Sequence, residues 1–256
     1  MQHIHHPDGL TYKYGVPFVI WCYWEGEEMS DNRLLSFNYL QQHIQVPVCL
    51  ITPQNLPDFI KKEHPLPDSY NDLSIVHRSD YIRAYLLHHY GGAWHDIKAT
   101  KVSYANIWEE FQNPDIWIVG RPETPGGAAK VYTSDGKYAP EQYKNLIAVP
   151  SWVGRPYTKM SDEILSGIET IFRQYASLLK KFPARHPREK KLIGRNMFHR
   201  LALKIKFVCQ QRSLHYPLEW TLFGNVFHPV ILKYQEHVSF NLPVDSKKNA
   251  GVYHRR

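Results

Sequence analysis

The residues with the clearest chemical potential lie in positions 80–96, which hold two carboxylates and an arginine at short spacing. Asp80 and Arg83 are three residues apart in a predicted helix and therefore share one helix face. Two glycines then end that helix and lead into a strand that delivers Asp96. Carboxylates accept hydrogen bonds from sugar hydroxyls, and a guanidinium binds phosphate or orients a carboxylate. The joint arrangement therefore favours a crevice that binds a sugar nucleotide.

Each of these three residues also has a purely structural interpretation. Asp80 can cap its own helix with Arg83 as a surface partner, an ion pair worth less than about 1 kcal/mol. Asp96 can simply end a strand. For each residue alone the structural interpretation is favoured, and only the three residues together favour a site.

The elements that must position these residues alternate between strands and helices. Such alternation predicts an α/β fold, with a mainly parallel Rossmann-like sheet and helices on its faces. Ligands bind at the carboxyl ends of the strands in such sheets, and Asp96 lies near one of these ends. The predicted strands cover residues 16–24, 46–51, 93–97, 115–119 and 145–149. One predicted helix begins near residue 31, and three more cover residues 79–90, 161–182 and about 189–211. Short β-like pieces follow at the end of the chain.

We predict a single domain over residues 1–256. Residues 16–150 form its ligand-binding core, and residues 151–256 form a helical extension on the acceptor side. The segment 121–144 is rich in proline and glycine, and a loop of this length is either functional or passive. A flap over the site and a passive insertion both remain open for it.

The central motif resembles that of a known enzyme family. Residues 79–96 follow the pattern S-D-x-x-R-x-x-x-L-x-x-x-G-G-x-[aromatic]-x-D, which is similar to the core motif of the family 32 and capsular polysaccharide synthesis glycosyltransferases. Residues 17–26 also resemble the P-x-I-I-W-x-Y-W-x-G opening of these enzymes. The resemblance is sharp over about residues 16–100. It implies a GT-A-like fold and sugar transfer with retention of anomeric configuration, in which the leaving phosphate takes the acceptor proton and no separate base is needed.

The resemblance also implies roles for the motif residues. Asp80 and Arg83 would hold the donor sugar and its phosphates, and Asp96 would be the first acid of the D-x-D motif, which binds a metal ion. Trp94 would pack near the ribose or the sugar.

Three further residues complete the predicted donor site. The resemblance implies that Trp21 or Trp24 stacks on the base of the nucleotide. By position, Asn196 would contact the donor sugar.

The sequence departs from this family pattern at position 98, where lysine replaces the second acid of D-x-D. Mn²⁺ and Mg²⁺ need oxygen ligands, and an ammonium group cannot be one. Our hypothesis is that Lys98 itself lies against the diphosphate and stabilises its charge. Two alternatives remain: Lys98 points into solvent while Asp96 alone holds Mn²⁺ or Mg²⁺ through water, or the enzyme is inactive.

The charge of the chain is concentrated in one segment. The 256 residues carry a net charge of +7, but the segment from Lys180 to Arg212 alone carries +10, with Glu189 as its single acid. A cationic surface of this kind fits an anionic membrane, where lipid-linked acceptors lie, or it is a solvated helix face. The chain shows no signal-peptide pattern, no apolar run long enough to span a bilayer and only three cysteines. We therefore expect a cytoplasmic protein, with peripheral binding to the inner face of the cell membrane as an option.

The sequence thus predicts a glycosyltransferase. It would move a sugar from a nucleotide-sugar, most simply a UDP-sugar, to a glycan or lipid-linked acceptor in surface polysaccharide or lipopolysaccharide synthesis. The first alternative is a non-catalytic nucleotide-sugar or glycan-binding protein on the same fold. A nucleic-acid-binding protein, suggested by a pI near 9.1, lacks any nucleic-acid motif, so we expect no nucleic-acid partner. A glycoside hydrolase would need paired carboxyls on either side of a bond, which nothing in the spacing indicates.

Overall fold

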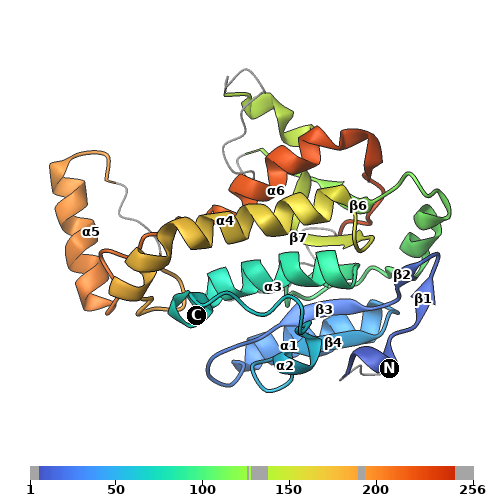
Figure 1. The fold of residues 1–256 in the computed structure, drawn as a ribbon, viewed down its shortest axis with the longest axis horizontal. Helices are drawn as coiled ribbons and strands as arrows, with labels where there is room; N and C mark the ends of the chain where they lie inside the picture. The colour runs from blue at the N-terminus through green and yellow to red at the C-terminus, as the bar shows by residue number, and fades with distance from the viewer. Residues whose placement is uncertain (1–5, 126, 128–137, 190–193, 246–256) are drawn as a thin grey trace.

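The computed structural model describes residues 6–125, 127, 138–189 and 194–245, and within them a six-stranded sheet forms the centre of the molecule (Figure 1). In spatial order its strands are β4 (Val48–Ile51), β3 (Ile20–Tyr23), β5 (Gly92–His95), β7 (Ile147–Gly154), β6 (Ile118–Pro122) and β8 (Val238–Ser239). A separate two-stranded hairpin pairs β1 (Tyr12–Lys13) with β2 (Val16–Pro17) and follows a short 3₁₀ turn, η1 (Pro7–Gly9). The run predicted as one strand over residues 16–24 is therefore divided between β2 and β3.

The sheet is mostly parallel, as the sequence predicts. β3 runs parallel to both β4 and β5, and β6 runs parallel to β8. β7 is the exception, because it pairs antiparallel with both of its neighbours, β5 and β6. The direction of β7 could not be predicted, since an apolar run has the same pattern in either direction. The predicted α/β class, with a GT-A-like, Rossmann-like sheet and flanking helices, is confirmed.

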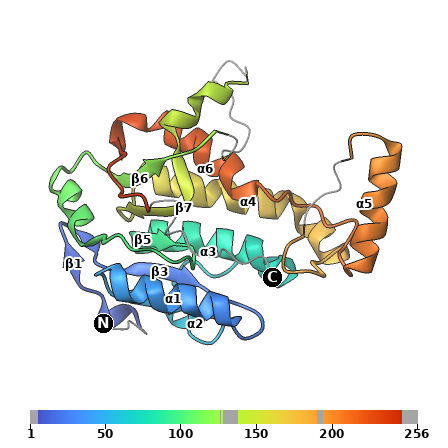
Figure 2. The ribbon, with the colours of Figure 1, turned by 180° about the vertical axis from the view of Figure 1, so that it is seen from behind.

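Helices cover both faces of the sheet (Figures 1 and 2). One face packs against α3 (Ile75–His89), α4 (Lys159–Lys181) and α6 (Leu222–Lys233) in a core that includes Trp21, Trp94 and Trp152. The other face packs against α1 (Asp31–His43) and the 3₁₀ helix η3 (Ala105–Gln112). Shorter elements connect these layers, namely α2 (Leu56–Phe59), η2 (Tyr70–Asp72), η4 (Pro140–Asn145) and η5 (Gln235–His237).

The connection between α3 and β5 requires glycine. Gly91 and Gly92 have φ values of +73° and +88°, which other residues rarely adopt. A Cβ atom on Gly91 would also lie 2.6 Å from Pro156 Cδ and 2.8 Å from the Gly154 carbonyl oxygen. α3 begins four residues earlier than predicted, where the Ser74 side chain accepts a hydrogen bond from the His77 amide as an N-cap. The tight turn leads the chain directly from α3 into the strand before Asp96.

The last third of the chain departs further from the sequence prediction. α4 matches the predicted helix at residues 161–182. Of the next helix, predicted at about 189–211, residues 190–193 lie outside the described residues, and the described helix is α5 (Met197–Cys209). The prediction of only short β-like pieces after it is wrong, because α6 spans twelve residues. Pro229 lies inside α6 and, with the β-branched residues beside it, gives the segment a strand-like composition. Of the segment 121–144 predicted as a flap or insertion, residues 126 and 128–137 lie outside the described residues.

Candidate functional site

A cavity of about 1000 Å³ opens at the carboxyl ends of the parallel strands β3 and β5. Its wall includes Asp80 and Arg83 from α3 and Asp96 just after β5. The loop after β3 and the first turn of α6 also border it. This volume is at the upper end of the range for small-molecule sites. The structure therefore brings the three predicted residues together in one cavity.

Arg83 lies between the two carboxylates. Its Nη2 is 3.3 Å from Asp80 Oδ1 and 3.6 Å from Asp96 Oδ1, and its Nη1 donates to the Val149 carbonyl oxygen at 3.1 Å. The guanidinium carbon lies 4.8 Å and 4.7 Å from the ring centroids of Trp94 and Phe223. Within the described part of the chain, Arg83 Nε is buried without a hydrogen-bond partner.

The Asp80 carboxyl is buried, and its protonation is sensitive to its surroundings. Burial raises the pKa of Asp80 to about 7, with Arg83 opposing this effect and the charge of Asp96 adding to it. A carboxyl group with this pKa can accept a hydrogen bond from a hydroxyl when ionised or donate one when protonated.

The Asp96 carboxyl is in a different state. Its Oδ1 accepts a hydrogen bond from Trp94 Nε1 at 3.1 Å, and its Oδ2 lies 3.3 Å from Lys98 Nζ. Burial alone would raise the pKa of Asp96, but Arg83, Lys98 and the Trp94 hydrogen bond together hold it below its usual value. Asp96 is therefore the carboxylate that is ionised near pH 7, whereas Asp80 titrates close to that pH.

The donor set does not fit Mn²⁺ or Mg²⁺. Both oxygens of Asp96 already face cationic or donor groups, and Lys98 occupies the position of the second acid. Hard divalent cations need several oxygen ligands. Over residues 6–125, 127, 138–189 and 194–245, no cluster of three or more His, Cys, Asp or Glu side chains is arranged to hold a metal ion.

The two tryptophans predicted as base-stacking candidates have different surroundings. Trp24 borders the cavity, its Nε1 donates to the Glu27 carbonyl oxygen at 2.9 Å, and the guanidinium of Arg33 lies 5.7 Å from its ring centroid. Trp21 is only 1% exposed and does not border the cavity. Its Nε1 donates to the Gly91 carbonyl oxygen at 2.7 Å, so the ring supports the glycine turn. The structure corrects the suggestion that Trp21 stacks on a base, because strand β3 directs this side chain into the core.

Asn196 is not brought to the cavity. It is the N-cap of α5, and its side-chain oxygen accepts a hydrogen bond from the His199 amide at 2.8 Å. This arrangement accounts for asparagine at this position as a helix cap and corrects its suggested contact with the donor sugar.

Several cavity residues come from parts of the chain that the sequence motif does not include. The cavity is also bordered by α6 and by the two residues before it, through Trp220, Thr221, Phe223, Gly224 and His228. Burial lowers the pKa of His228 to about 4, so its imidazole is neutral near pH 7. Its Nε2 contacts the Ile147 carbonyl oxygen at 3.2 Å, whereas its Nδ1 is buried without a partner in the described residues. The helical spacing of Leu222, Phe223, Phe227 and Ile231 was the signal that could have placed this helix.

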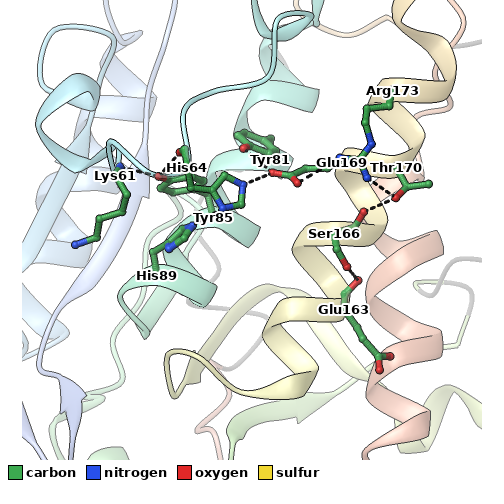
Figure 3. A network of polar contacts seen from close by, with 10 residues as sticks. All are labelled: Lys61, His64, Tyr81, Tyr85, His89, Glu163, Ser166, Glu169, Thr170 and Arg173. Carbon is green, nitrogen blue, oxygen red and sulfur yellow. Dashed lines mark hydrogen bonds and ion pairs between the residues drawn. The ribbon is translucent and has the colours of Figure 1, made fainter.

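A polar network on another side of α3 holds the helix in place (Figure 3). Glu169 of α4 accepts a hydrogen bond from the hydroxyl of Tyr81 at 3.0 Å, and its Oε1 lies 2.6 Å from His64 Nε2. Tyr85, one turn further along α3, donates to the His64 carbonyl oxygen at 2.8 Å. Because Tyr81 follows Asp80 directly, this network fixes the rotation of α3 and thus the direction of the Asp80 side chain.

Comparison with known proteins adds a family to this geometry. No curated protein matched the chain. A family model described as "Capsular polysaccharide synthesis protein" matches residues 11–182, which is about two thirds of the chain. The matched region includes Asp80, Arg83, Asp96 and Lys98, whereas α5 and α6 lie beyond it. The chain therefore belongs to the family of capsular polysaccharide synthesis proteins.

Proposed function

We propose that this protein is a glycosyltransferase that moves a sugar from a nucleotide-sugar, in the first instance a UDP-sugar, to a glycan or lipid-linked acceptor. The family associates the chain with capsule biosynthesis. The observation that carries the proposal is the convergence of Asp80, Arg83 and Asp96 in a cavity at the carboxyl ends of the parallel strands. That edge of an α/β sheet is where such folds bind their ligands.

In this proposal the two carboxylates hold the donor sugar. Asp80 and Asp96 accept hydrogen bonds from its hydroxyls, and Arg83 keeps the two carboxylates at a fixed separation through its contacts to both. Trp24 stacks on the base, since it is the tryptophan of the opening motif that borders the cavity. Trp94 lies beneath the guanidinium and orients Asp96 through its indole N–H.

The leaving diphosphate is stabilised by fixed cations. Lys98 is held near the site by its ion pair with Asp96, and the Arg83 guanidinium lies on the other side of that carboxylate. Cations that are already in position stabilise developing negative charge without reorganisation. The poor fit of the donor set to a divalent ion supports the same role for Lys98.

The chemical step needs no protein base. The bond between the anomeric carbon and the phosphate oxygen breaks, and its electron pair stays on the phosphate. The acceptor oxygen forms the new bond on the same face of the sugar, and its proton passes to a leaving phosphate oxygen. Retention of configuration is part of the proposal through the family resemblance.

The acceptor enters beside the first turn of α3. Pro187 lies there, because its carbonyl oxygen accepts a hydrogen bond from the Val76 amide at 3.3 Å. His186 and Arg188, on either side of Pro187, border the cavity. Trp220 borders it from the segment before α6 and is 42% exposed. An exposed aromatic ring at a cavity mouth suits the apolar face of a sugar.

Resistance to chelation tests the proposal. We expect the wild-type transfer rate to stay within about twofold in excess EDTA, because Lys98 supplies the positive charge that a metal ion otherwise supplies. We expect Lys98→Asp, which restores the second acid, to lose transfer in EDTA and to recover part of it with Mn²⁺. The measurement is release of nucleoside diphosphate and labelled product with a panel of nucleotide-sugars.

A metal-dependent glycosyltransferase in the same buffer serves as the control that chelation is complete. Loss of wild-type transfer in EDTA, with full recovery on adding Mn²⁺, would reject the role given to Lys98. Absence of transfer with every donor, while nucleotide-sugar still binds, would favour a non-catalytic binding protein.

A further inference from the structure

Helix α5 exposes an unusual amount of apolar surface. Met197 and Phe198 are each 78% exposed, and Leu201, Ile205 and Val208 are between 56% and 63% exposed. The helix stands at one end of the molecule, beyond α4, in both views of the fold (Figures 1 and 2). A large contiguous apolar patch that is exposed on a protein surface usually marks an interaction site.

The exposed residues form one continuous face. At about 100° per residue, the apolar face of α5 spans an arc of about 140°. Its members are Met197, Phe198, Leu201, Ala202, Ile205, Val208 and Cys209. A different stripe attaches the helix to the protein, through the buried Phe207 and the half-buried Leu203. The residues that pack α5 against the protein are therefore different from those that form its exposed apolar face.

Cationic side chains border this face. In the same projection Lys204 lies at one edge of the apolar face and Lys206 at the other. Arg200 lies next to Lys204 around the helix axis, further from the apolar face. Residues 197–209 contain no aspartate or glutamate. A helix with an apolar face, lysine borders and no acid is the pattern of helices that lie in the interface of an anionic bilayer. Lysine stems can lie along the apolar zone while their ammonium groups reach the headgroups.

We infer that α5 is a membrane-docking helix that inserts its apolar face into an anionic bilayer surface. The charge pattern favours a bilayer over a second copy of the chain. Two copies packed through this face would bring Lys204 and Lys206 of each chain close to those of the other, with no acid on the helix to compensate. An anionic surface instead satisfies the apolar face and the cationic borders together.

Docking through α5 would place the cavity near the membrane. Arg188 and Arg212 border the cavity, and α5 lies between them in the chain. A bilayer-bound α5 would therefore hold the acceptor side of the site close to lipid-linked substrates. This consequence rests on the proposed function, whereas the docking itself does not.

Vesicle binding by the full chain tests the inference without any activity assay. We expect co-flotation with vesicles of phosphatidylglycerol and phosphatidylcholine at low salt, much weaker binding at high salt and little binding to phosphatidylcholine alone. Phe198→Ser combined with Ile205→Ser should weaken binding at least about tenfold, since two large apolar side chains are removed from the interface. The matched control is Leu34→Ser with Leu35→Ser on α1, where both residues are also exposed and binding should not change.

The apolar face carries its own reporter position. Cys209 is exposed, whereas Cys22 and Cys49 are buried, so a thiol-reactive, polarity-sensitive dye labels Cys209 selectively. We expect its emission to shift to the blue with the anionic vesicles. The inference is overturned by absence of binding at low salt, by binding that Phe198→Ser with Ile205→Ser leaves intact, or by light scattering that shows a dimer dissolved by the same two substitutions. Transfer to a short soluble acceptor tests the proposed function separately, and the two substitutions should leave it unchanged.

Discussion

Replacing Asp96 with asparagine should reduce the turnover number for sugar transfer roughly a thousandfold, the size of effect seen when a group that stabilises transition-state charge is removed. Asp96 holds Arg83 and Lys98 at 3.6 Å and 3.3 Å through its two oxygens. Asparagine has nearly the same shape but no charge, so it cannot hold both cations toward the donor. It also offers the donor hydroxyls a weaker acceptor.

The matched control for this prediction is Asp68→Asn, at an exposed position that does not border the cavity. The measurement is the turnover number at saturating donor, together with thermal unfolding of each variant. An Asp96→Asn protein that remains folded and transfers sugar within about tenfold of the wild type would remove Asp96 from the catalytic site.

Replacing Asp80 with asparagine should abolish transfer and should remove a loss of stability that the wild type undergoes as the pH rises toward 7. Burial raises the pKa of Asp80 to about 7 from an ordinary value of 3.8. The folded protein therefore keeps a proton that the unfolded chain has already lost between these two values. The free energy of unfolding contributed by Asp80 must then fall as the pH rises from about 4 to about 7. Asparagine has no proton to lose, so this loss of stability disappears.

The readout for this prediction is the difference between Asp80→Asn and wild type, measured by urea unfolding from pH 4 to pH 8. The difference is needed because burial lowers the pKa of His77, His89 and His228 to about 4, and their titration acts in the opposite direction over part of this range. We expect the variant to gain stability relative to wild type as the pH rises. A difference that is constant across the range would show that Asp80 has an ordinary pKa.

The central residues of the site could be predicted because their geometry is local. Asp80 and Arg83 are one helical turn apart, and the glycine pair allows only a tight turn into the strand that leads to Asp96. A short stretch of sequence therefore determines how these residues lie relative to one another. The parallel pairing of β3 with β5 then places Asp96 at the ligand-binding edge of the sheet.

The remaining differences arise from long-range packing. Trp21 and Trp24 are equally plausible in the motif, and only the packing of Trp21 against Phe59 and Tyr90 separates them. His228 reaches the cavity from a helix more than a hundred residues after the motif, so no local pattern connects it with Asp80. The charge of α5 was visible in the sequence, but its apolar face was not distinguishable from a buried one until its exposure was known.

The most direct test of the account is a thermal-shift panel of UDP-, GDP- and CMP-sugars, measured in EDTA on wild type and on Asp96→Asn. We predict that at least one nucleotide-sugar raises the melting temperature of the wild type by roughly 5 °C, because it binds only the folded state. The same compound should shift the Asp96→Asn variant far less. No shift with any nucleotide-sugar, or equal shifts in the two proteins, would contradict a donor site built on Asp80, Arg83 and Asp96.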